Sequence, residues 1–96
     1  MAADIDELTV DYYEGDQHLV KQLDKVVLSK GAWVTIIYRY QDWEAAKGAF
    51  GADKFTIRRY QKRNGEYFQK SKFNISSIDQ AQKIIAALQG WMSETS

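Results

Sequence analysis

The sequence KFTIRRYQKRNGEYFQKSKFNI, from Lys54 to Ile75, decides the expected fold because it has the pattern of two strands joined by a tight turn. The strands are predicted at Lys54–Lys62 and Glu66–Ile75, with Arg63-Asn64-Gly65 as the turn. One acid lies in the segment, against these seven basic residues: Lys54, Arg58, Arg59, Lys62, Arg63, Lys70 and Lys72. The local net charge is +6 in a chain of zero formal net charge, so we expect an anionic partner.

Strand alternation divides this segment into an apolar row and a basic row on opposite faces. The apolar row is predicted to contain Phe55, Ile57, Tyr67, Phe73 and Ile75. The basic row is predicted to contain Lys54, Thr56, Arg58, Tyr60, Lys62, Glu66, Phe68, Lys70 and Lys72. Cations interleaved with rings suit a single strand of nucleic acid, which offers phosphates and open base faces in alternation. A duplex is a poorer match because its base faces are stacked inside and a flat sheet offers no helix for the major groove.

Length and composition predict one small globular domain. The chain has 96 residues, of which 45% are hydrophobic and 14% aromatic. We expect this domain at residues 17–92, between an acidic flexible arm at 1–16 and a polar tail at 93–96. The chain has no cysteine, which excludes disulfides, thiolate metal sites and a cysteine nucleophile.

The amino-terminal arm is acidic and carries no lysine or arginine. Its acids are Asp4, Asp6, Glu7, Asp11, Glu14 and Asp16. Three interpretations remain open: a solvated terminus, an arm that competes with nucleic acid for the basic hairpin, and a short added strand. The charge is the reverse of a signal peptide and no apolar run reaches the ~18 residues of a membrane span. We therefore expect a soluble cytoplasmic protein, nucleoid-associated if bacterial, with no membrane partner.

The segment between the arm and the hairpin contains mixed signals. The apolar spacing predicts a turn of helix near Gln17–Leu23, followed by a strand at about Lys25–Ser29. A second strand is expected at Trp33–Trp43, which is rich in β-branched and aromatic residues. Neither face of that strand is simply polar, as would suit a sheet covered by a helix on one side and by a partner on the other. The small residues of Glu44–Asp53 predict a loop.

A carboxy-terminal helix is predicted to begin at Ser77-Ile78-Asp79-Gln80, which matches a capping box. Its apolar stripe is Ile78, Ala81, Ile84, Ile85 and Leu88, extended by Trp91 or Met92. Gly90 is expected to end or fray the helix.

The side chains offer little for catalysis. His18 is the only histidine and has no recognisable partner, the acids are scattered or terminal, and no glycine-rich phosphate loop or metal-ligand spacing occurs. We therefore expect a binding protein rather than an enzyme, with no cofactor, metal or small-molecule substrate. A ligand-filled pocket near His18 or the acids would instead indicate an enzyme.

The chain resembles the DNA-binding core of the positive cofactor four transcriptional coactivators in three motifs and the helix that follows them. The motifs are Phe55-Thr56-Ile57-Arg58-Arg59-Tyr60, Gly65-Glu66 and Lys72-Phe73-Asn74-Ile75-Ser76. This resemblance implies four antiparallel strands and a helix, a dimer, and single-stranded DNA held on curved sheets. The chain departs from the family at Gln61, where an aromatic is usual, at Asn74, where glycine is usual, and in its longer loop at 44–53. Pur-type nucleic-acid-binding repeats, with the same order of elements, are the second choice.

Together these observations predict an α+β domain with a four-stranded twisted antiparallel sheet and a C-terminal helix, in the order β-β-β-β-α, forming a homodimer. We expect it to bind single-stranded DNA, or RNA, as a transcriptional coactivator or regulator. The lysines and arginines are expected to contact phosphates, and Tyr60 and Phe68 to stack on bases. Arg39 and Trp43 are expected to extend the surface from the neighbouring strand. The predicted nucleic-acid-binding residues are Lys54, Arg58, Tyr60, Lys62, Phe68, Lys70, Lys72, Arg39 and Trp43. The alternative is an adaptor domain for an acidic protein partner.

Overall fold

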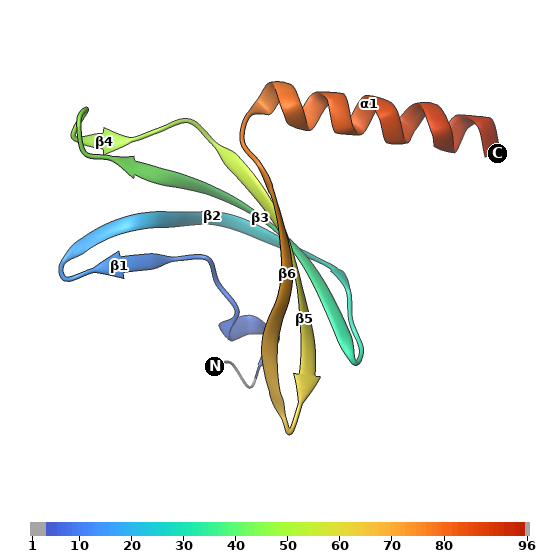
Figure 1. Ribbon diagram of the computed structural model, residues 1–96, viewed down its shortest axis with the longest axis horizontal. Coiled ribbons are helices and arrows are strands. Elements are labelled where there is room, and N and C mark those ends of the chain that lie inside the picture. Colours follow the sequence, from blue (N-terminus) through green and yellow to red (C-terminus); the bar gives the residue numbers. More distant parts are fainter. Residues whose placement is uncertain (1–3, 96) are drawn as a thin grey trace.

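A computed structural model describes residues 4–95 as an α+β fold, a curled antiparallel sheet with one C-terminal helix (Figure 1). Its elements are η1 (Ile5–Glu7), β1 (Tyr12–Glu14), β2 (Gln17–Ser29), β3 (Trp33–Glu44), β4 (Ala49–Phe50), β5 (Lys54–Arg63), β6 (Glu66–Ile75) and α1 (Ile78–Thr95). The strand order is β1-β2-β3-β5-β6, and β4 pairs with β3 beside this path. The α+β class is confirmed. The expected count of four strands is not, because β1 and β4 add to the predicted set.

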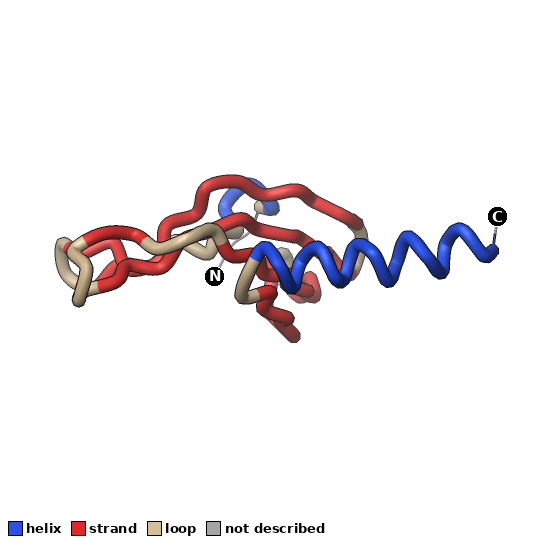
Figure 2. The backbone as a smooth tube through the Cα atoms, turned by 90° about the horizontal axis from the view of Figure 1, so that it is seen from above, coloured by secondary structure: helices blue, strands red, loops and turns tan. Residues whose placement is uncertain are grey.

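The molecule is a thin layer rather than a closed double layer. Its Cα atoms span 50 × 39 × 17 Å. Figure 2 shows α1 running beyond the margin of the sheet instead of lying flat across it. A helix in this position leaves much of one sheet face without cover from the described chain.

The β5–β6 hairpin has the two predicted strands, but its turn is shorter than predicted, because Arg63 belongs to β5 and pairs with Glu66. Asn64 and Gly65 both have positive φ, 53° and 79°, as a two-residue hairpin turn requires. The pairing of Arg59 with Ser71 and of Tyr60 with Gln69 leaves an extra residue, Lys70, on β6. This β-bulge reverses the alternation on the turn side of β6.

Strand β2 is continuous over 13 residues, so the predicted turn of helix at Gln17–Leu23 is wrong. Its pairing with β3 shifts between Gln22 and Asp24 and again between Val27 and Ser29. Each shift inserts a residue into the alternation, which spreads the apolar side chains at three- and four-residue intervals. These intervals imitate helical spacing.

The buried core lies on one face of the sheet, which we call the arm face. Its buried side chains are Val34, Ile36, Tyr38, Thr56, Tyr60 and Tyr67. Leu8 and Val10, from the predicted arm, complete this core at 7% and 5% exposure. Residues 4–14 therefore contribute to the core and, through β1, to the sheet; Met1–Ala3 lie outside the described residues.

The opposite face, which we call the helix face, carries Ile37, Phe55, Ile57 and Ile75 beside α1. The helix begins as predicted, since the backbone N–H of Gln80 donates to Ser77 Oγ at 3.1 Å. Gly90 does not end it: α1 continues through Ser93 and Glu94 of the predicted tail to Thr95, and Ser96 lies outside the described residues.

Candidate nucleic-acid interface

Five of the predicted binding residues share the arm face. Tyr40 pairs with Lys54, and Arg58 pairs with Lys72, so these cations continue the row of buried tyrosines. Alternation along β5 places Tyr60 and Lys62 on the same face. The shared residues are Lys54, Arg58, Tyr60, Lys62 and Lys72. The predicted juxtaposition of the β5 row with Lys72 is therefore present.

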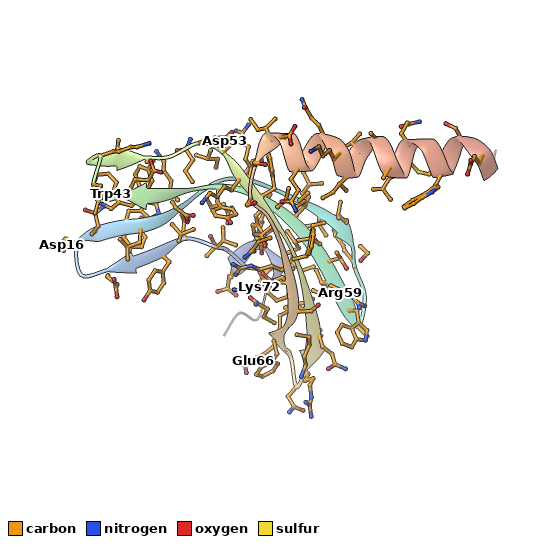
Figure 3. All side chains as sticks on the ribbon, turned by 45° about the horizontal axis from the view of Figure 1, so that its top comes forward. Asp16, Trp43, Asp53, Arg59, Glu66 and Lys72 are labelled. Carbon is orange, nitrogen blue, oxygen red and sulfur yellow. The ribbon has the colours of Figure 1, made fainter. Side chains whose placement is uncertain are left out.

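The other four predicted residues do not join this row. The bulge on β6 places Phe68 opposite Gln61, on the helix face, and leaves Lys70 unpaired. Arg39 pairs with Phe55 and alternates to the helix face. Trp43 packs edge-on against Phe50 at 5.2 Å, at the end of the sheet far from the β5–β6 turn (Figure 3).

The cations of the interface differ in how far their charge is already compensated. Lys54 Nζ lies 2.9 Å from Asp42 Oδ2, and this hydrogen bond and charge raise the pKa of Lys54. Arg39 Nε stands 3.8 Å from Asp53 Oδ2. Within residues 4–95, no ion pair with a carboxylate occurs at Arg58, Lys62, Lys70 or Lys72. Those four cations are better placed than Lys54 to meet phosphate.

Arg58 is the most constrained cation of the group. Its Nη1 donates to Gln69 Oε1 at 3.2 Å, while its Nε is buried with no hydrogen-bond partner among the described residues. The side chain lines a cleft of about 430 Å³ between the arm and the sheet, together with Tyr12, Tyr40 and Asn74. A buried guanidinium N–H without an acceptor is costly, so an anionic oxygen entering this cleft would relieve it.

The tyrosines of the arm face are closed off in this structure. Tyr60 is 4% exposed, and its hydroxyl lies 2.8 Å from that of Tyr38. Burial, the hydrogen bond with Tyr60 and the charge of Tyr60 raise the pKa of Tyr38, so the Tyr38 hydroxyl stays neutral. Leu8 and Val10 pack into the same cluster. Tyr60 cannot stack on a base while the arm is seated.

A second group of rings was not predicted because it depends on β4, which the sequence pattern did not indicate, and on β1, which was one of three open interpretations of the arm. Tyr13 stacks on His18 at 4.1 Å, and His18 meets Phe50 edge-on at 5.8 Å. Lys21 Nζ lies 5.3 Å from the Phe50 ring centre. His18 also bonds Asp11 at 2.9 Å, so it is a structural residue at the arm rather than an isolated surface histidine.

The helix face and α1 form an apolar groove of about 400 Å³. Its walls are Leu28, Ile37, Phe55, Ile57, Ile75, Ala81, Ile84, Ile85 and Leu88. The groove is open, because Ile85 and Leu88 on its α1 wall are 62% and 49% exposed. An exposed apolar surface of this kind on a small protein is a candidate interaction site.

Asn74, where the resembled family has glycine, has a structural role in this chain. Its Oδ1 accepts the hydroxyl of fully buried Thr56 at 2.8 Å. Asparagine in place of glycine therefore provides a hydrogen-bond acceptor for the Thr56 hydroxyl, which water cannot reach.

Comparison with known proteins is negative at every level. No protein-family model, curated protein or solved structure matches the chain. The resemblance to the positive cofactor four family accordingly stays a prediction based on the motif residues. Over the part of the chain that the structure describes, no helix combines the length and apolar character needed to cross a membrane.

Proposed function

We propose that this chain binds single-stranded nucleic acid, with DNA favoured over RNA, through the arm face of its sheet. The observation that carries the proposal is the shared face: Arg58, Lys62 and Lys72 lie beside the row of Tyr38, Tyr60 and Tyr67. Phosphates would meet the cations and bases would meet the rings, as single strands do on open sheets. The motifs between Phe55 and Ser76 support a role as a transcriptional coactivator or regulator.

Binding is proposed to occur in a homodimer joined through the helix face. One chain carries both an exposed apolar helix stripe and an apolar sheet face that α1 covers only in part, so a two-fold axis would let the helix of each copy cover the groove of the other. The groove contains no charged side chain among the residues that line it. A second copy of the chain therefore fits this groove better than an acidic protein partner would.

The test is a titration of fluorescent oligothymidylate at two salt concentrations. Four phosphates neutralised on a single strand would give a log-log salt slope of about −3. The Arg58→Ala, Lys72→Ala double variant should weaken binding and reduce the slope to about −1.4, since two contacts are removed.

A matched control removes two charges elsewhere. Lys47 and Lys83 are exposed and are paired with Glu44 and Asp79, away from the arm face. The Lys47→Ala, Lys83→Ala variant should bind with the native slope, and equal weakening by both variants would mean that only net charge matters. If no oligonucleotide binds at low salt while a stoichiometric acidic protein is retained from nuclease-treated extract, the adaptor function replaces this proposal.

A further inference from the structure

The segment of residues 4–11 lies over the surface that the proposed function assigns to nucleic acid. Leu8 and Val10 are almost fully buried against the cluster that contains Tyr38, Tyr60 and Tyr67. Ile5 packs at the margin of the same cluster. The rings that would stack on bases are therefore covered by the chain's own amino-terminal segment.

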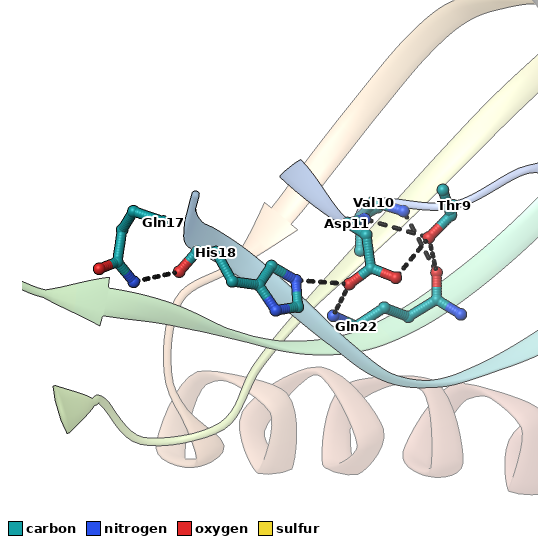
Figure 4. Close-up of polar contacts among 6 residues, drawn as sticks. All are labelled: Thr9, Val10, Asp11, Gln17, His18 and Gln22. Carbon is teal, nitrogen blue, oxygen red and sulfur yellow. Dashed lines mark hydrogen bonds and ion pairs between the residues drawn. The ribbon is translucent and has the colours of Figure 1, made fainter. Parts of the chain in front are cut away.

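Individual side chains hold this segment in place. Lys25 Nζ donates to the backbone oxygens of Ile5 and Leu8, each at 2.8 Å. Gln22 Oε1 accepts from Val10 N at 3.2 Å and from Thr9 Oγ1 at 2.6 Å (Figure 4).

Asp11 anchors the end of the segment. Its Oδ1 accepts from Gln22 N at 2.7 Å and contacts His18 Nε2 at 2.9 Å (Figure 4). Partial burial acts to raise the pKa of Asp11, but the hydrogen bonds from Gln22, His18 and Thr9 outweigh it and lower the pKa overall.

These contacts can be released without breaking the sheet. Ladder pairing of the amino-terminal segment begins only at Tyr12, where β1 joins β2. The pairing of β2, β3, β5 and β6 does not involve residues 4–11. Displacing the segment would expose the tyrosine row and leave every ladder between those four strands in place.

The segment also shares the negative charge of the ligand. It consists of η1 and the residues that lead from it to β1, and it carries Asp4, Asp6, Glu7 and Asp11 on a sheet face whose cations include Arg58 and Lys72. We propose that residues 4–11 are an intramolecular competitor, which a single strand must displace to reach the tyrosine row. This inference rests on the proposed function and adds its regulation. If the segment is seated in about nine molecules of ten, apparent affinity is about tenfold below that of the open face.

The experiment locks the segment in place and then frees it. Because the chain has no cysteine, Thr9→Cys with Gln22→Cys provides a unique pair whose native side chains touch. A short bis-methanethiosulfonate linker joins the two thiols, and reductant removes it. The matched control, Tyr13→Cys with His18→Cys, links the neighbouring strands β1 and β2 at a paired position and leaves residues 4–10 free.

We expect the locked protein to bind oligothymidylate at least tenfold more weakly than its reduced form, and the control to bind equally in both states. As a second variant, Leu8→Ser with Val10→Ser keeps every charge and should bind about tenfold more tightly than the native chain. Equal binding by locked and reduced protein would overturn the competitor role while leaving the proposed function standing. Absence of binding by the native, reduced and serine forms alike would instead overturn the proposed function.

Discussion

The two faces of the sheet are both too apolar to face water, but the described chain covers the arm face more completely than the helix face. On the arm face, Leu8 and Val10 complete a core in which Ile36 and Tyr38 are fully buried. On the helix face, α1 stands beside the sheet and leaves Ile85 largely exposed. The difference teaches that the arm face is closed within one molecule, whereas the helix face leaves apolar side chains of α1 exposed and is the surface that we propose for a second copy. It also separates the surface proposed for nucleic acid from the surface proposed for the dimer.

The largest expected effect concerns the helix face. Leu88 lines the apolar groove, so Leu88→Glu would place a charge in the proposed dimer interface. We expect the native chain to sediment at twice the chain mass and the variant to sediment as a monomer. Gln82→Glu adds the same charge at an exposed position outside the groove and should remain dimeric. A monomeric native chain at all concentrations would contradict this assignment.

A pair of identical truncations compares the two faces directly. Ile36→Ala removes a fully buried side chain and should lower the free energy of unfolding by about 2–5 kcal/mol. Ile85→Ala should change it by about 0.5 kcal/mol or less in the dilute monomer, because this side chain is exposed there. Denaturant unfolding at low concentration measures both, and equal losses would show that the faces are not distinct.

The smallest effect is a pH dependence of the arm. Because the pKa of Asp11 is lowered in the folded chain, its carboxylate stabilises the seated arm above the unfolded value of about 3.9. That stabilisation is lost as pH falls through the folded-state pKa. The amide resonance of Gln22, which donates to Asp11, should therefore shift with a midpoint below about 3.9. The same shift in Asp11→Asn would assign the transition to another group.

The hairpin was predictable because its signals are local. Alternation over Lys54–Lys62 and the turn signal Arg63-Asn64-Gly65 predicted both strands, with β5 ending one residue later than expected, and Ser77 predicted the start of α1. Strand β2 was mistaken in part for helix because two bulges break its alternation. The bulge at Lys70 likewise moved Phe68 away from the basic row. A bulge cannot be recognised in the sequence of one strand, because it is defined by the pairing of that strand with its neighbour.

The sequence predicted which cations of the candidate site share a face, but not which parts of that face are covered. Arg58, Lys62 and Lys72 lie on one face as expected. Tyr60 was assigned to the solvent side, yet the same alternation gives a buried ring once an arm lies over it. Leu8 and Val10 alone form too short an apolar pattern to indicate that they would cover it. Which segment packs on a half-apolar sheet face is decided by tertiary contacts.

The central claim is tested most directly by comparing one oligonucleotide as a single strand and as a duplex of the same sequence. Fluorescence anisotropy at low salt measures both affinities with the native chain. We predict saturable binding of the single strand and much weaker binding of the duplex, because stacking on the tyrosine row needs open bases. Equal affinity for the two forms, or a preference for the duplex, would contradict the account.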